Sequence, residues 1–461
     1  MNNIIYYISF SILIYFFILC IGYTVILFGT VFKILKKYKS YKFNNIILEF
    51  DTNPLLPITI IIPAYNEVRR IANAVASVFN SNYKNVNLII VNDGSTDSTL
   101  QQLIDDYFLV RIPPAFKKKI ITGEVRAYYQ STRYPHLIVI DKEHSPFANS
   151  GADCINAGLN VCRTPLFITL DADTILEPEA LTHMIFMYLT TPHCVAVGGD
   201  VYIPDPDKIK DGKLLATSIP SNTLLGVQVC EYLRSFSYGR EGWELLGGAL
   251  CYPGAFTMLE TQAVIDAGGF DSCNFAYDAE IIMKLHHVMG EKKHPYSVTY
   301  APSAIVWSEG PKTLKTFWNQ RNHWQRGLLR CLSLHWKMIG NVNYGVTGLL
   351  AFPSYILFEI FGPIVESIAY VTLILAVIFT PALLLNMGWL LCLAWGYSTF
   401  ITMSCVILSL LTFDKYHSKM DILHLFFLNT LDMIFYRQFR AFCALFAAIH
   451  YVFNRILGRS Q

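Results

Sequence analysis

The stretch Leu88-Ile89-Ile90-Val91-Asn92-Asp93-Gly94-Ser95 joins an apolar run of strand length to an acidic turn. A second stretch repeats this arrangement, because Phe167-Ile168-Thr169-Leu170 leads into Asp171-Ala172-Asp173. Short β-branched runs that alternate with helix-like segments indicate βαβ units and a mostly parallel sheet. Open α/β sheets bind ligands at the carboxyl ends of their strands. Both acidic stretches are therefore predicted to lie at one binding edge.

The same alternation extends from about residue 53 to residue 308. Residues 58–62 are predicted to form a buried strand, residues 66–80 a helix, and residues 137–141 another strand. The stretch Pro63-Ala64-Tyr65-Asn66-Glu67 then falls at the carboxyl end of the first strand. Residues 108–134 are rich in proline, lysine and arginine, and we expect a loop or insertion there.

Apolar sequence flanks this polar block. Hydrophobic side chains make up 53% of the 461 residues and charged ones only 15%. No charged residue occurs between Ile4 and Phe32, and five lysines follow between residues 33 and 42. This order predicts a transmembrane helix whose C-terminal end lies in the cytoplasm, since a cleaved signal peptide would carry its positive charge before the apolar run.

Two further apolar runs, residues 345–380 and 383–413, are each long enough to span a bilayer. Glu359 and Glu366 lie seven residues apart in the first run and would share one helical face. They either line a polar channel or lie in the membrane interface. Residues 422–456 are apolar but carry interspersed charges, so interfacial helices, re-entrant helices and a final hairpin all fit.

The balance of charge argues against nucleic acid as a partner. The net charge is +2, and no basic stripe with interleaved aromatic residues occurs. Eleven cysteines are scattered without the spacing of a metal site, which is typical of buried thiols in a reducing compartment. A Rossmann oxidoreductase is discounted because no Gly-x-Gly-x-x-Gly turn follows the first strand.

Each acidic motif alone has a plain structural explanation. Asn, Asp, Gly and Ser form turns, and the acids of Asp171-Ala172-Asp173 could cap a helix. Their fixed order behind three apolar strands makes chance agreement improbable. A pyrophosphate-linked sugar needs a divalent ion held by carboxylates, and a separate carboxylate can read uridine. Together these features predict a nucleotide-sugar enzyme built onto a membrane.

Two later segments add candidate catalytic groups. Asp278 opens a helical pattern and could merely cap it, but it is the best remaining candidate for a general base. The stretch from Trp318 to Gly327 is basic and aromatic, which is typical of an interfacial anchor. Trp324 in this stretch could also be a stacking platform for a sugar ring, and both roles are compatible.

From about Pro57 to Trp324, and into the helices beyond, the chain resembles the membrane-embedded family 2 glycosyltransferases, which include cellulose, chitin, hyaluronan and poly-N-acetylglucosamine synthases. The resemblance implies an α/β domain of GT-A type, with a mostly parallel sheet, inserted between transmembrane helices. The expected division is an N-terminal transmembrane helix (1–35), a cytoplasmic GT-A domain (50–310), amphipathic interfacial helices (311–344) and C-terminal transmembrane or interfacial helices (345–461).

The resemblance also implies roles for individual residues. Asp93 would bind the uridine, Asp171 and Asp173 would contact the nucleotide and hold Mg²⁺ or Mn²⁺, and Asp278 would be the general base. Tyr277 stands where the family often has an acid. The remaining expected contacts fall into a donor set and one acceptor residue: Pro63, Tyr65, Glu67, Asp153, Gln320 and Arg321 for the donor, and Trp324 for the acceptor.

The chain departs from the family pattern at two places. His323 stands where the family has an arginine before the tryptophan, so one fixed cation near the pyrophosphate is lost unless Arg321 or Arg326 substitutes. No lysine precedes Gly151-Ala152-Asp153 in the stretch that begins at Asn149, although related bacterial sequences have one there.

The expected function is inverting, metal-dependent transfer of a sugar from a UDP-sugar to a growing polysaccharide at the cytoplasmic (inner) membrane. The catalytic domain is expected to face the cytoplasm, and export of the product could be coupled to synthesis. Two alternatives stay open at this point. One is the transfer of a single sugar to a lipid or glycolipid, and the other is a degenerate nucleotide-binding partner protein.

Overall fold

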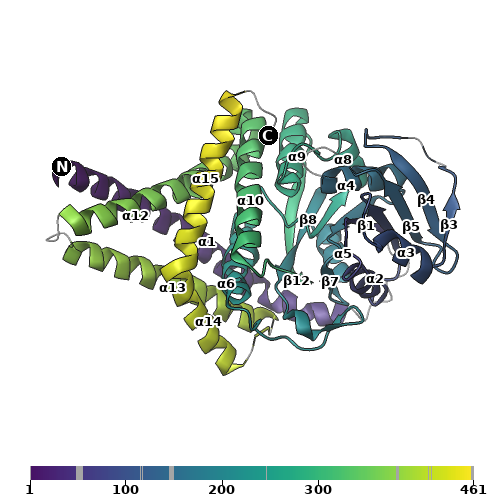
Figure 1. Ribbon diagram of the computed structural model, residues 1–461, viewed down its shortest axis with the longest axis horizontal. Helices are drawn as coiled ribbons and strands as arrows, with labels where there is room; N and C mark the ends of the chain where they lie inside the picture. The colour runs from purple at the N-terminus through teal and green to yellow at the C-terminus, as the bar shows by residue number, and fades with distance from the viewer. Residues whose placement is uncertain are drawn as a thin grey trace.

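The computed structural model describes residues 2–47, 56–114, 116, 118–144, 150–245, 247–379, 384–413, 415–416 and 418–457. Figure 1 shows an α/β body on one side of the molecule and long helices on the other. Parts of the predicted segments, namely residues 50–55, Asn149, Thr380 and Leu383, lie outside the described residues.

Four parallel strands form the centre of a ten-stranded sheet. Their order is β5 (Leu137–Lys142), β2 (Val86–Asn92), β1 (Ile58–Ala64) and β6 (Leu166–Leu170). Ala64, Asn92 and Asp141 pair with one another across this centre, so the carboxyl ends of three strands stop at one level. The fold class predicted from the sequence, a mostly parallel GT-A-type sheet beside long apolar helices, is confirmed.

Helices cover both faces of the sheet and form two separate cores. Ile60 and Ile62 of β1 belong to the core that contains α2 (Ile71–Phe79), whereas Ile61 points into the core that contains α4 (Ser150–Val161). Gly158 lets α4 approach closely, because a Cβ there would lie 2.7 Å from Cγ2 of Ile61. Because successive side chains of β1 point to opposite faces, the sheet lies between two layers of helices, which gives three layers in all.

Further strands, some antiparallel and some parallel to their neighbours, extend the sheet on both sides. On one side stand β11 (Phe256–Glu260), β8 (Cys194–Tyr202), β12 (Ser297–Ser308) and β7 (Thr174–Leu176). On the other side, β3 (Leu109–Ile112) and β4 (Val125–Ser131) form the edge. The prediction of a loop or insertion over residues 108–134 was therefore wrong for these segments. Edge strands are covered incompletely and tolerate the polar side chains that suggested a loop.

The helix predicted over residues 66–80 begins later than expected, at Ile71. Asn66 has a left-handed backbone, with φ of 56°. Its side-chain oxygen accepts hydrogen bonds from the backbone N–H groups of Thr96 (2.8 Å) and Asp97 (3.2 Å). Asparagine tolerates this conformation, and its short side chain can hydrogen-bond nearby backbone groups. The turn that delays α2 therefore ties the end of β1 to the segment after β2.

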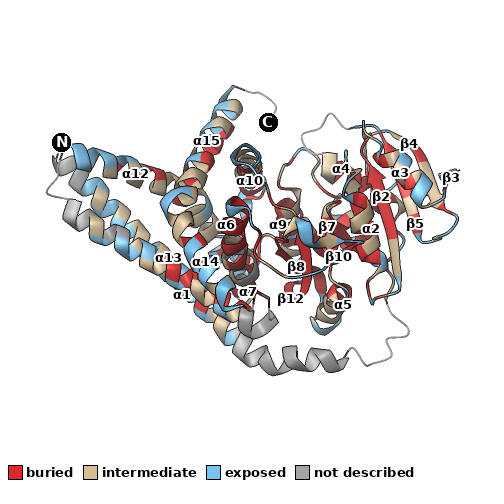
Figure 2. Cartoon of the chain, turned by 60° about the horizontal axis from the view of Figure 1, so that its bottom comes forward, coloured by how far each residue is buried: buried red, intermediate tan, exposed pale blue. Residues whose placement is uncertain are grey.

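Among the residues that the structure describes, three helical segments are long and apolar enough to cross a membrane: Tyr7–Phe32, Thr347–Phe379 and Cys392–Ser409. The first belongs to α1 (Asn2–Ile47), which continues through the lysine-rich stretch. The second ends in α12 (Phe361–Phe379) and contains two π-helical segments, Thr347–Ala351 and Ile356–Ile360. The third lies in α13 (Leu384–Phe413). Figure 2 shows burial concentrated in the α/β body, with many exposed residues along the long helices.

The apolar tail forms α14 (Lys419–Leu431) and α15 (Arg437–Ile456), joined by a π-helical segment. Asp432, Arg437 and Arg440 of this tail form ion pairs. Arg437 Nε lies 2.6 Å from Glu366 Oε1, and Arg440 Nη2 donates to Asp432 Oδ2 at 2.9 Å. Paired charges explain how this tail keeps ionised groups among apolar helices. Asp414 and His417, which precede α14 in the sequence, lie outside the described residues.

Candidate active site

A cavity of about 280 Å³ opens at the carboxyl ends of β1, β2 and β6, where it meets the start of α4. The chain adds β2 and β5 on one side of β1 and then returns to place β6 on the other side, and such switch points bind ligands in open α/β sheets. The cavity brings together six residues that the sequence singled out, namely Pro63, Tyr65, Glu67, Asp93, Asp171 and Asp173.

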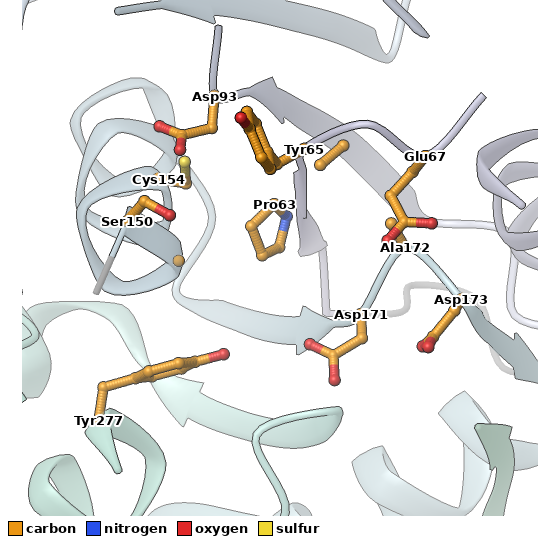
Figure 3. Close-up of a pocket in the computed structure, with 12 residues that line it drawn as sticks. Pro63, Tyr65, Glu67, Asp93, Ser150, Cys154, Asp171, Ala172, Asp173 and Tyr277 are labelled. Atoms are coloured by element: carbon orange, nitrogen blue, oxygen red, sulfur yellow. The ribbon is translucent and has the colours of Figure 1, made fainter. Parts of the chain in front are cut away.

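Figure 3 shows two groups of side chains around this cavity. Asp93 lies on one side with Cys154 and Ser150 of α4. Glu67, Asp171 and Asp173 lie on the other side, and Pro63 and Tyr65 stand between the groups. Tyr277, from the first turn of α9 (Tyr277–Lys292), points its hydroxyl into the cavity. The cavity therefore has one wall with a single carboxylate and one wall with three.

The wall with three acids has a negative electrostatic potential. Burial raises the pKa of Asp171 to about 7, with further contributions from Asp173, Asp278 and Glu67. Burial and the charge of Glu67 raise the pKa of Asp173 to about 6, although Ser308 Oγ lies 3.3 Å from its Oδ1. Carboxylates that repel one another at low dielectric fit a hard divalent cation such as Mg²⁺ or Mn²⁺, which prefers oxygen ligands.

This wall is not a complete protein cage for a metal. In the part of the chain that the structure describes, no three His, Cys, Asp or Glu side chains converge as a metal site would require. Mg²⁺ is usually bound by one or two carboxylates together with phosphate oxygens and water. Asp171 and Asp173 therefore fit a cation that arrives with a diphosphate.

The wall with one acid is held by a lysine that the sequence interpretation missed. Lys142, at the end of β5, is fully buried, and its Nζ lies 2.5 Å from Asp93 Oδ1 and 3.0 Å from Asp153 Oδ2. Asp153 does not line the cavity but binds this lysine from α4 and accepts from the backbone N–H of Gly123. A lysine directly after a buried strand was the available signal.

Asp278 lies beside the acidic wall, in the first turn of α9. The backbone N–H of Gly254 donates to its Oδ2 at 3.2 Å, and it borders a small second cavity together with Tyr277. Burial raises the pKa of Asp278, even though Gly254, Ala279 and Arg240 favour its charged form. A carboxylate with a raised pKa is a better proton acceptor, which suits the predicted base.

The segment from Gln320 to Gly327 belongs to α10 (Leu314–Leu334) and packs against the start of α9. A Cβ on Gly327 would lie 2.5 Å from the backbone nitrogen of Ala276. Arg321 is buried, and its Nη2 donates to Glu231 Oε2 at 2.9 Å. Its guanidinium lies 4.1 Å from the centre of the Trp324 ring, which is 37% exposed.

The structure therefore places α10 outside the lining of the large cavity. Among the described residues that line the large cavity, Gln320, Arg321 and Trp324 are absent. The exposed Trp324 ring lies on the helix that packs beside Asp278. His323, where the family has an arginine, stacks on Phe275 with ring centres 4.9 Å apart.

Family models match two parts of the sequence. The model for glycosyl transferase family 2 matches residues 59–114, which hold β1, α2, β2 and Asp93. The model for glycosyl transferase family group 2 matches residues 166–436, more than half of the chain. The chain belongs to glycosyl transferase family group 2. The family and the enzyme class predicted from the residues are thereby confirmed.

This family 2 glycosyltransferase is similar to poly-β-1,6-N-acetyl-D-glucosamine synthases. It is 25% identical over 279 residues to that synthase from Staphylococcus aureus (strain COL), which covers 60% of this chain and 56% of the relative. It is 24% identical over 300 residues to that of Staphylococcus epidermidis (strain ATCC 35984), covering 65% of this chain and 61% of the relative. The match thus spans somewhat over half the length of these relatives.

A solved structure shares the fold. A mannosyltransferase from Pyrobaculum calidifontis, determined in complex with GDP-Man and Mn²⁺, aligns with a TM-score of 0.52 over 86% of this glycosyltransferase and 98% of that chain. The two sequences are 16% identical, so the likeness concerns the fold alone.

Proposed function

We propose that this glycosyltransferase moves a sugar from a UDP-sugar to a growing polysaccharide at the cytoplasmic membrane, with inversion at the anomeric carbon. The observation that carries the proposal is the two-walled cavity, which sets a single buried carboxylate opposite a cluster of acids. A nucleoside diphosphate has a neutral base at one end, which the single carboxylate can bind, and phosphates at the other, which the acids can bind through a divalent cation. Similarity to polysaccharide synthases supports a polymeric product.

Donor binding in this proposal uses both walls. Tyr65 and Asp93 hold the uracil ring, with Pro63 beneath it and Lys142 and Asp153 fixing the Asp93 carboxylate. Asp171 and Asp173, with Glu67 beside them, would hold Mg²⁺ or Mn²⁺. The ion would supply positive charge that offsets the negative charge of the departing nucleoside diphosphate.

Asp278 accepts the proton of the acceptor hydroxyl as that oxygen bonds to the anomeric carbon. The bond from that carbon to the diphosphate breaks on the opposite face, which inverts the configuration. The partial burial that raises the pKa of Asp278 suits this role, because a stronger base takes the proton more readily. Trp324, on the neighbouring helix, offers its exposed ring to the acceptor sugar. Gln320 and Arg321 stay predicted donor contacts, and Glu231 already neutralises Arg321.

The domain division and orientation are part of the same proposal. Residues 1–35 anchor the chain, residues 50–310 form the cytoplasmic domain, residues 311–344 lie at the interface, and residues 345–461 include the later spans. The three candidate spans and the lysine-rich stretch after the first support this arrangement. The product would leave between helices near Glu359 and Glu366.

The test is transfer from radiolabelled UDP-sugars in membranes that contain the full chain. We expect UDP release from one donor of a panel, together with products of increasing size. A single small glycolipid product would support the transfer of one sugar instead. Absence of UDP release with every donor would overturn the enzymatic proposal.

Removing divalent cations is expected to abolish UDP release, and Mg²⁺ or Mn²⁺ should restore it. Asp173→Asn should raise the cation concentration for half-maximal activity at least about tenfold, because one anionic oxygen ligand is lost. The measurement is a cation titration of UDP release, with Asp105→Asn, an exposed acid of α3 (Thr99–Asp106), as the control. Full activity in excess EDTA would contradict metal dependence.

A further inference from the structure

The side chain of His144 contacts both Tyr65 and Asp93, the two residues that the proposed function assigns to the nucleobase. Its ring stacks on Tyr65, with ring centres 4.4 Å apart and an interplanar angle of 22°. Its Nδ1 lies 2.5 Å from Asp93 Oδ2. An ionised carboxylate only accepts hydrogen bonds, so this nitrogen carries the proton. One ring thus stacks on the tyrosine and donates to the carboxylate at the same time.

A uracil ring bound by Tyr65 and Asp93 would make the same pair of contacts. It is flat, and its N3–H is a donor flanked by carbonyl groups. Stacked aromatic rings already sit about 4.5 Å or more apart between centres, so no third ring fits between His144 and Tyr65. Asp93 Oδ1 is taken by Lys142, which leaves Oδ2 as the oxygen for an incoming donor. The imidazole and the base therefore compete for one place.

We propose that His144 is a specificity-determining residue that holds the nucleobase place in the donor-free enzyme and is displaced by the incoming base. The side chain is 47% exposed and can rotate into solvent. Lys142 stays paired with Asp93 after this movement, so no buried carboxylate is left without a cation. A displacing base regains both lost contacts only if it carries a ring N–H. Uracil meets this condition, whereas the corresponding nitrogen of cytosine is an acceptor that would face the carboxylate.

The proposal rests on nucleotide binding at Tyr65 and Asp93, which is part of the proposed function. It predicts that removal of the His144 ring strengthens UDP binding, whereas removal of a residue that simply contacts the base would weaken it. When the binding-competent state is only fractionally populated, the apparent affinity falls by that fraction. If the stacked state of His144 holds roughly nine-tenths of the population, removing the ring should tighten UDP binding about tenfold. A residue that merely supported the base would weaken binding when removed.

The experiment is calorimetric titration of the detergent-solubilised full chain with UDP and CDP. We expect His144→Ala and His144→Ser to bind UDP about tenfold more tightly than the natural protein, at the population assumed above. His136→Ala, an exposed histidine just before β5, is the matched control and should leave the dissociation constant unchanged. UDP should bind at least about tenfold more tightly than CDP in every one of these proteins.

The outcomes separate this proposal from the proposed function. Equal or weaker UDP binding by both His144 variants, with the natural protein binding UDP, overturns the place-holding role alone. Equal affinity for UDP and CDP overturns the selectivity for a ring N–H. No UDP binding by any variant, together with no UDP release from UDP-sugars, overturns the nucleotide site and this proposal with it.

Discussion

Replacing Asp278 by asparagine is expected to lower kcat by about 10²–10⁴-fold, the usual contribution of a positioned general base. Asparagine is nearly the same size and can still accept the hydrogen bond from the Gly254 backbone N–H, so the local structure should persist. It cannot take a proton from the acceptor hydroxyl. The KM for the UDP-sugar should change little, because Asp278 borders the small cavity rather than the large one proposed to bind the donor. Initial rates of UDP release at varied donor concentration measure both constants.

The matched control for this variant is Asp266→Asn, an exposed acid at the end of α8 (Thr261–Asp266). It makes the same chemical change without touching either cavity, and its kcat should equal that of the natural protein. Natural kcat in Asp278→Asn would contradict the assignment of the base. A rise in donor KM with unchanged kcat would instead indicate a donor contact.

The role of Asp278 as a base also leads us to expect that kcat depends on pH in one direction. A general base works only when it is deprotonated, so activity is lost as the pH falls through its pKa in the enzyme. Burial raises the pKa of Asp278, which moves this loss to a higher pH than the value of about 3.9 for a free aspartate would give. In a profile of kcat against pH, kcat should therefore begin to fall during acidification while the pH is still above 4. A kcat that stayed constant down to pH 4 would contradict a base of this kind.

The parts of the site that could be predicted from the sequence are those set by local rules. Asp93, Asp171 and Asp173 each follow a buried strand, and the topology of a parallel sheet brings strand ends to one edge. The edge strand β3 and its neighbour β4 escaped prediction, because a partly buried strand carries the same polar residues as a loop.

Long-range pairing could not be predicted. Lys142 lies 49 residues from Asp93, and the ion pair forms only because β5 pairs with β2 in a register that opposes Asp141 to Asn92. The bond between Arg321 and Glu231 likewise depends on how α10 packs against α6 (Thr223–Tyr232). Nothing in the local composition specifies such partners.

Replacing Lys142 by methionine is expected to destabilise the α/β domain by about 3–5 kcal/mol, the usual cost of removing one partner of a buried ion pair. Methionine fills much of the same space but leaves Asp93 and Asp153, both buried, without the cation that lies between them. For a domain of this size the loss corresponds to a decrease of roughly 6–20 °C in the unfolding temperature. Thermal unfolding of the detergent-solubilised chain, followed by tryptophan fluorescence, measures it.

Two further variants show whether this loss comes from the missing charge. Lys142→Arg keeps a cation between the two carboxylates and should recover part of the stability, limited by the larger guanidinium group in a closed space. Lys118→Met makes the same substitution at an exposed lysine and should leave the unfolding temperature unchanged. If Lys142→Met unfolded at the temperature of the natural protein, Asp93 and Asp153 would not depend on the lysine. Because the buried charge of Asp93 is what a uracil N–H would meet, stability and nucleotide binding should fall together in Lys142→Met.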